Sequence, residues 1–196
     1  INMEIIIILL LILINGIFAM AEIAIISARK SKLQHQANEG SKNAQAALNL
    51  AQSPGRFLST VQIGITFVGV FAGAFGGETI AKSLSLELKT IPLLSPYASG
   101  IAIFLVVAFI TYISLIIGEL VPKRVALNSP EIIAKFMAYP MNILSSIASP
   151  LVSLLTFSTD WVFRLLQIKP STEPLVSDEE IKLLLGEGTR LGIFNI

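Results

Sequence analysis

The residue with the clearest chemical meaning in this sequence is a carboxylate at the end of a long uncharged segment. Glu119 closes the longest such segment, so its side chain lies within a membrane or at its edge, where carboxylates are costly and typical of functional sites. Pro122 has no N–H to donate to the carbonyl of Gly118. A carboxylate beside a freed carbonyl provides the hard oxygen donors that bind Mg²⁺, Ca²⁺ or Na⁺. The alternative is an interfacial Glu119 that pairs with Lys123 or Arg124.

A second carboxylate, Glu22, ends the first apolar segment in a similar way. If the helix continues to Ile26, Glu22 lies about one turn inside the membrane; the alternative is a carboxylate that reaches the interface. Gln62 and Thr66 lie four residues apart in the next apolar segment and therefore share a helix face. These groups and Glu119 lie toward the same predicted side of the membrane, so they could converge at one depth around an ion or a cationic substrate.

Small residues in the second apolar segment form another pattern. Gly69, Gly73 and Gly77 recur every four residues, a spacing that lets two membrane helices approach closely. We predict a helix-packing seam here, and we assign Pro122 to helix packing as well. The small side chains in this segment could also leave room for an ion.

Membrane helices must position these residues, because the composition excludes an ordinary soluble domain. Hydrophobic residues make up 54% of the 196 residues and charged residues only 14%, whereas soluble domains have about 25% charged residues. Four segments contain no charge and are close to, or longer than, the roughly 20 residues that a spanning helix needs. They are 5–21, 57–77, 90–118 and 136–159. The predicted fold class is an all-α membrane protein.

Three of these segments are predicted to cross the membrane. Lys and Arg are most frequent between the first and second segments, and such residues favour the cytoplasmic side, which places the N-terminus outside and the C-terminus in the cytoplasm. Pro140, Pro150 and a stripe of polar residues in the fourth segment favour juxtamembrane helices over a span. The expected elements are spans at about 4–27, 56–80 and 97–121, a cytoplasmic helical hairpin at 28–52 and juxtamembrane helices at about 130–168. The hairpin is expected to break at Gly40, with Ser41 as an N-cap.

Composition also removes several classes of function. The chain contains no Cys and one His, and its net charge is +1, which excludes thiol chemistry and a His-rich metal site and gives no basic field for nucleic acid. No nucleophile–base pair or phosphate loop is present, so we do not expect an enzyme. The first segment is expected to be retained, because its basic residues follow it and those of a signal peptide precede it.

Three runs in this order resemble the transmembrane domain of the CNNM/CorC family, which includes bacterial proteins described as hemolysin-C or TlyC-like. The resemblance covers nearly the whole chain. The runs are Asn15-Gly16-Ile17-Phe18-Ala19-Met20-Ala21-Glu22-Ile23-Ala24, Gln62-Ile63-Gly64-Ile65-Thr66 and Gly118-Glu119-Leu120-Val121-Pro122-Lys123.

The resemblance implies a homodimer in the bacterial inner membrane, in which each subunit has three spans and a belt of juxtamembrane helices. It implies export of Mg²⁺, and sometimes Co²⁺, driven by Na⁺ entry. Residues 1–170 then correspond to the transmembrane domain, and 171–196 resemble the linker helix toward a cytoplasmic pair of CBS domains, through which a nucleotide would bind. A natural short tail is the alternative to that missing region.

The resemblance also implies an ion site. In the better-studied branch the ion is held by a Ser in the first span, an Asn in the second and the Glu that matches Glu119. The Ser position falls on Ala19 and the Asn position near Ile65, so two of three side-chain ligands are replaced by apolar residues. Glu22, Gln62 and Thr66 lie within one turn of these positions and could substitute, with Gly118 beside Glu119.

Three functions follow as hypotheses. The first is a divalent-cation exporter, with Mg²⁺ as the substrate, Na⁺ as the coupling ion and Glu119 as the central ligand. The second is a polyamine exporter, because the Ala-Glu-Ile-Ala and Gln-Ile-Gly runs resemble a bacterial branch with such a protein. Two carboxylates and an amide suit a diamine such as putrescine, whereas Mg²⁺ requires near-octahedral oxygens. The third is a non-transporting membrane anchor that relays nucleotide sensing to a partner.

Overall fold

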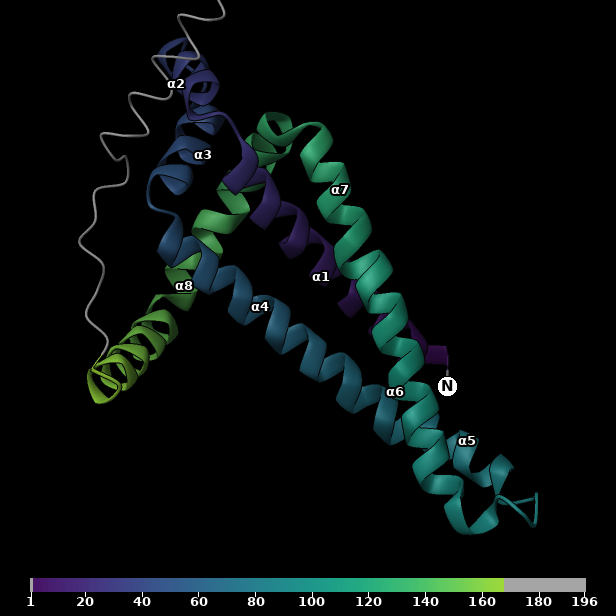
Figure 1. Cartoon of the computed structure of the whole chain (residues 1–196). Coiled ribbons are helices and arrows are strands. Elements are labelled where there is room, and N and C mark those ends of the chain that lie inside the picture. Colours follow the sequence, from purple (N-terminus) through teal and green to yellow (C-terminus); the bar gives the residue numbers. More distant parts are fainter. Residues whose placement is uncertain (1, 168–196) are drawn as a thin grey trace, which may run out of the picture. The chain divides into compact units, whose positions relative to one another are not determined.

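The computed structural model describes residues 2–167, and all regular structure in this part of the chain is helical. The chain falls into two units, Ile1–Leu154 and Leu155–Ile196, and the first contains all the predicted site residues. The elements are α1 (Asn2–Ser27), α2 (Lys30–Asn38), α3 (Lys42–Gln52), α4 (Pro54–Phe75), η1 (Gly76–Ile80), α5 (Ala81–Leu88), η2 (Ser95–Tyr97), α6 (Ala98–Leu115), η3 (Ile116–Leu120), α7 (Val121–Asn128) and α8 (Pro130–Leu165) (Figure 1). The all-α fold class is confirmed.

Helix α1 connects the other helices of the first unit. It packs against α4 on one side and against η3 and α7 on another. Small residues such as Ala21 and Ala24 are fully buried along it, which lets the neighbouring helices approach closely. They belong to a core that also contains Ile25, Phe57 and Val61. Glu22 therefore lies next to a packed core rather than on a free helix end.

The predicted hairpin between the first two apolar helices is present as α2 and α3. Gly40 adopts a φ of 94°, a conformation that favours glycine, and it separates the two helices. The hydroxyl of Ser41 accepts a hydrogen bond from the N–H of Ala44 at 3.3 Å, so Ser41 is the N-cap of α3. Leu33 and Leu48 from the two helices are buried in the same core.

Two of the helices continue through a π-helical turn. Helices α4 and α5 join through η1, and α6 and α7 join through η3. In η3 the N–H of Val121 donates to the carbonyl of Ile116, which is the five-residue spacing of a π-helix, a feature often found at functional sites. Helical structure therefore continues past the predicted span ends to Leu88 and Asn128.

The structure contains four helices that are long and apolar enough to cross a membrane, one more than predicted. They are Met3–Ser27, Pro54–Phe75, Ser95–Asn128 and Pro130–Leu165. The additional one, α8, is a single helix of 36 residues that begins at Pro130 and continues through Pro140 and Pro150. Its polar stripe had favoured an interfacial position, but part of that stripe contacts α4: the hydroxyls of Thr60 and Ser145 are 3.3 Å apart and hydrogen-bonded, and Arg56 donates to Ser149.

The second unit is described only to residue 167. Its described part is the last turns of α8, which expose Trp161 and Phe163. The predicted linker helix at 171–196 lies outside the described residues.

Candidate functional site

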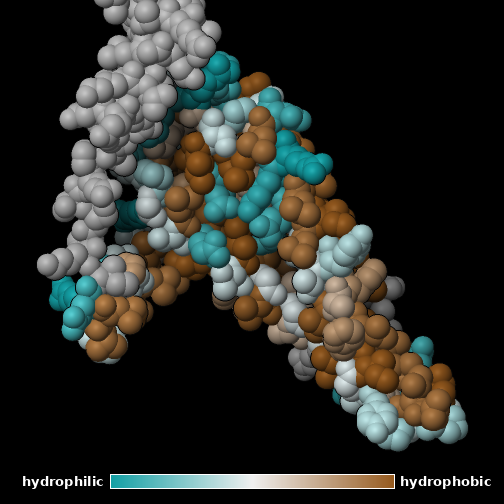
Figure 2. Space-filling model, in the orientation of Figure 1, coloured by the Kyte–Doolittle hydropathy of each residue, from teal (hydrophilic) through white to brown (hydrophobic). Residues whose placement is uncertain are grey.

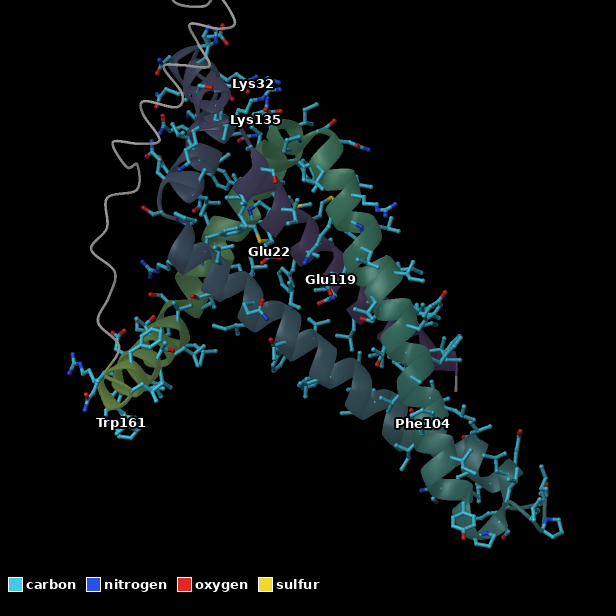
Figure 3. All side chains as sticks on the ribbon, viewed as in Figure 1. Glu22, Lys32, Phe104, Glu119, Lys135 and Trp161 are labelled. Carbon is cyan, nitrogen blue, oxygen red and sulfur yellow. The ribbon has the colours of Figure 1, made fainter. Side chains whose placement is uncertain are left out.

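The two carboxylates singled out in the sequence share one ammonium group. The Nζ of Lys123 lies 2.7 Å from Oε1 of Glu119 and 3.6 Å from Oε2 of Glu22. Figure 3 shows the two glutamates close together, Glu22 on α1 and Glu119 on η3. Their side chains are 19% and 35% exposed and that of Lys123 is 29% exposed. We call these three residues the Lys123 cluster; two carboxylates and one ammonium give it one net negative charge.

Close packing of α1 against η3 and α7 places this cluster. A Cβ on Gly16 would lie 3.1 Å from the Pro122 ring and 3.2 Å from the carbonyl of Ile117, and a Cβ on Gly118 would lie 3.2 Å from the carbonyl of Ile12. Larger residues at either glycine would push the helices apart. Pro122, which we had assigned to helix packing, is buried in this contact.

The carbonyl of Gly118 is not left without a donor, as the sequence had suggested. The side-chain amide of Asn15 donates to it at 3.1 Å. Asn15 is 6% exposed, and its other side-chain atom, Oδ1, is buried without a hydrogen-bond partner. Sequence reasoning missed this residue, although a polar amide inside an uncharged apolar segment was a signal. The acceptor that has no hydrogen-bond partner in this contact is therefore an amide oxygen of α1, next to Gly118.

The remaining predicted site residues do not join this cluster. Gln62 and Thr66 are exposed on α4, and in the described part of the chain no hydrogen bond joins them to either carboxylate. Ala19 is fully buried, and Ile65 packs against the core, so neither side chain offers a ligand. The contribution of Gln62 and Thr66 to binding stays a prediction.

The predicted glycine seam makes no close contact within this chain, and its role in helix packing stays a prediction. A Cβ on Gly69, Gly73 or Gly77 would meet nothing within 4 Å. The close contacts of this segment occur at other glycines: a Cβ on Gly64 would lie 2.7 Å from the ring of Phe18, and one on Gly76 would collide with Ile110. The four-residue spacing is real, but the helix face that carries it is turned away from the close helix contacts.

Two of these glycines border space beside the cluster instead. A pocket of about 180 Å³ lies between α4 and α6, and Gly69 and Gly73 line it together with Thr111, Ser114 and Glu119. The absence of side chains on the glycines creates room next to the carboxylate, and two hydroxyl groups border the same space. This pocket is small but polar where Glu119 enters it.

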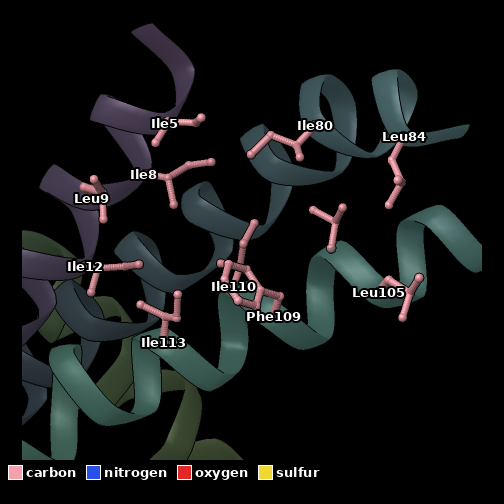
Figure 4. Close-up of a pocket in the computed structure, with 11 residues that line it drawn as sticks. Ile5, Ile8, Leu9, Ile12, Ile80, Leu84, Leu105, Phe109, Ile110 and Ile113 are labelled. Carbon is pink, nitrogen blue, oxygen red and sulfur yellow. The ribbon is translucent and has the colours of Figure 1, made fainter. Parts of the chain in front are cut away.

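A larger cavity in the same unit is unsuitable for a cation. It has a volume of about 560 Å³ and lies between α1, α5 and α6 (Figure 4). Ile, Leu, Val and Phe side chains alone line it. A cation there would lose its hydration without gaining a polar partner, so this cavity is not a candidate cation site.

The donor set of the cluster does not resemble a preformed metal site. Among the residues whose side chains the structure describes, no group of three or more His, Cys, Asp or Glu lies close enough together to hold a metal ion. Two carboxylates are present, and an ammonium group already occupies the position between them. A metal ion would have to displace Lys123 and recruit further oxygens.

A second charged cluster lies where α8 begins. Glu131 is 7% exposed at its side chain and accepts from Nε of Arg29 at 3.2 Å and Nζ of Lys32 at 3.4 Å. We call these residues the Glu131 cluster. It joins the start of α2 to the start of α8, and sequence reasoning used its basic residues only as a sign of orientation.

Fold and site together define an all-α membrane protein with a charged cluster among its apolar helices. The model of the Cyclin M transmembrane N-terminal domain (CNNM) family matches residues 5–196, and the chain belongs to this family, as the resemblance predicted. It is 46% identical over 195 residues to a UPF0053 protein of Synechocystis. The matched region covers 100% of this chain and 44% of that protein.

Two further relatives carry a functional name. Proteins named polyamine export protein from Haemophilus influenzae and Escherichia coli K12 are 31% and 28% identical to this chain, over 93% and 97% of it. Each match covers 42% of the relative. The chain thus spans less than half the length of the curated relatives that it matches.

Proposed function

We propose that this chain is the membrane domain of a transporter that exports organic cations of the polyamine type. The observation that carries the proposal is the position of Lys123, whose primary ammonium is held between Glu22 and Glu119. The cluster is thus already arranged around an alkylammonium group. The amino group of a diamine has the same charge and the same three donors, so it can replace Lys123 without a change in donor type.

The partial burial of the cluster supports this substrate class. Hydrogen bonds between ammonium and carboxylate groups are stronger where water is partly excluded, and both glutamates are less than half exposed. The unpartnered Oδ1 of Asn15, next to Gly118, is a further acceptor for a donor-rich cation. Two relatives named polyamine export protein agree with this choice.

Mg²⁺ is the second candidate substrate, and it was the first choice from sequence. Its support is Glu119, which matches the ion-binding Glu of the related exporters. Against it, Mg²⁺ demands near-octahedral coordination at about 2.1 Å, and Ala19 and Ile65 offer no oxygen from their side chains.

For either substrate we propose a homodimer in the inner membrane, with its N-terminus outside and export driven by Na⁺ entry.

The test is efflux from proteoliposomes that contain the full-length protein. We expect efflux of labelled putrescine, with a much smaller Mg²⁺ flux. In Glu119→Gln the rate of putrescine efflux should fall by about tenfold or more. Glu39→Gln is the matched control, since it makes the same chemical change at an exposed carboxylate on the edge of the α2–α3 hairpin. A Mg²⁺ flux that depends on Glu119, without putrescine flux, would support the second candidate. Flux of neither cation, with stable capture of a partner, would support the anchor hypothesis.

A further inference from the structure

The end of the first unit farthest from the carboxylates contains a polar pocket with two lysines. The pocket has a volume of about 340 Å³ and lies between α5 and the start of α6. Its polar lining comes from Lys82, Lys89, Ser85 and Ser99. Neither lysine has an ion-pair partner among the residues whose side chains the structure describes. The pocket therefore carries two positive charges that the described chain does not neutralise.

The floor of this pocket has a spare hydrogen-bond donor. The hydroxyls of Ser85 and Ser99 are 3.1 Å apart and hydrogen-bonded, and Ser85 is 6% exposed. A pair of hydroxyls has two protons, and their mutual bond uses one of them. One O–H thus remains for an acceptor, in the same space as the two ammonium groups. Two ammonium groups and a free O–H are together suited to bind an anion that has several oxygen atoms.

The depth of the pocket places it at a membrane surface. About 20 residues separate Ser99 from Glu119 along one helical segment, which is about 30 Å at 1.5 Å per residue. This equals the thickness of the hydrocarbon core. If Glu119 lies near one edge of the core, Lys82 and Ser99 lie at the level of the lipid headgroups on the other side.

An apolar groove begins where the polar pocket ends. It has a volume of about 430 Å³ along α6 and is lined by Gly100, Ile103, Phe104, Val107 and Ala108. Ile103 borders both spaces. Phe104 is labelled on this part of α6 in Figure 3, and Figure 2 shows a mainly hydrophobic surface over the same region. The groove continues from the headgroup level toward the middle of the membrane.

We propose that this composite surface binds an anionic phospholipid. The phosphodiester accepts hydrogen bonds from Lys82, Lys89 and the free hydroxyl of the serine pair, and one acyl chain lies along the groove beneath Phe104. Charge complementarity favours this occupant, because the two ammonium groups and the free hydroxyl that line the pocket match the negative charge and the oxygen acceptors of a phosphodiester. A polar pocket at headgroup depth that opens into an apolar groove matches a single amphipathic molecule.

Native mass spectrometry of the purified protein in detergent tests this assignment. We expect phosphatidylglycerol to be retained preferentially over phosphatidylcholine. The double variant Lys82→Gln/Lys89→Gln should lose about 30-fold in affinity for phosphatidylglycerol, about fivefold for each lysine. Lys30→Gln/Lys42→Gln is the matched control, because it removes two exposed charges from the α2–α3 hairpin, and it should retain the lipid. Equal retention by both double variants would overturn the proposal.

A second variant tests the apolar half of the site. A Cβ on Gly100 meets nothing within 4 Å, so Gly100→Leu fills the groove without a clash in the protein and should weaken phosphatidylglycerol binding severalfold. Gly55→Leu is its control, since Gly55 is equally open and lines no part of the groove. If Gly100→Leu has no effect, or if free inorganic phosphate displaces the lipid completely, the pocket is an anion site and the lipid assignment is wrong.

Discussion

The two charged clusters of the first unit have opposite compositions. At Glu131 one carboxylate is held by two cations, and at Lys123 one cation holds two carboxylates. The carboxylate of Glu131 is almost fully buried, while its partners Arg29 and Lys32 remain 77% and 50% exposed. The side chains of Glu22 and Glu119 are more exposed than that of Glu131. The Glu131 cluster therefore carries an excess of positive charge that water solvates, and the Lys123 cluster an excess of negative charge next to a pocket.

This difference separates a structural role from a binding role. A buried carboxylate with two partners joins two distant chain segments, and nothing in its surroundings is left for a ligand. A pair of carboxylates that share one ammonium is short of one positive charge, which a cationic substrate can supply. The location of uncompensated charge, rather than the number of charges, therefore identifies the binding site.

The largest effect on stability is expected from removal of both cations of the Glu131 cluster. Arg29→Ala/Lys32→Ala removes both cations from a carboxylate that is 7% exposed and leaves it only a backbone hydrogen bond. Stranding a buried polar group in this way costs about 1–3 kcal/mol. Thermal unfolding in detergent should show a large drop in Tm. Adding Glu131→Gln to the double variant removes the stranded charge and should restore part of the loss. If the triple variant is no more stable than the double, the carboxylate was not the source of the effect.

A smaller effect of a different kind is expected at the Lys123 cluster. Lys123→Gln removes the internal competitor of a cationic substrate, so putrescine should bind about tenfold more tightly, which is about 1.4 kcal/mol. Isothermal titration calorimetry of the purified protein measures this change. Lys135→Gln, at a lysine outside both clusters, should leave the affinity unchanged. Weaker binding in Lys123→Gln would mean that Lys123 orders the carboxylates for the substrate rather than competing with it.

Much of the fold was predictable because it depends on local sequence. Uncharged segments gave the apolar helices, and Gly40 with Ser41 gave the break in the hairpin. The ion pair between Glu119 and Lys123 was one of two alternatives from their spacing, since side chains four residues apart on a helix are neighbours, and the structure contains it. The spacing along the sequence is sufficient to predict a contact where both partners lie on one helical segment.

The parts that could not be predicted depend on how separate helices meet. Arg29 and Glu131 are 102 residues apart, and Asn15 and Gly118 are 103 apart, so no local pattern connects them. The four-residue spacing of the glycines is visible in the sequence. The direction in which their helix face points is not, because it follows from the packing of Gly64 on Phe18 and of Gly76 on Ile110. The fourth helix long enough to cross a membrane is α8. Its polar stripe could not be assigned from sequence, because part of it forms hydrogen bonds with α4.

The smallest effect on stability, and the sharpest test of the binding role, is expected at Asn15. Asn15→Leu keeps the size of the side chain and loses the hydrogen bond to Gly118, worth about 1 kcal/mol. It also removes the buried, unpartnered Oδ1, whose cost of about 1–3 kcal/mol offsets that loss. The Tm should therefore change little, while putrescine affinity falls severalfold because the acceptor next to Gly118 is gone. If the Tm falls strongly and the affinity is unchanged, Asn15 belongs with Glu131 as a structural residue, and the negative charge of Glu22 and Glu119 alone accounts for binding.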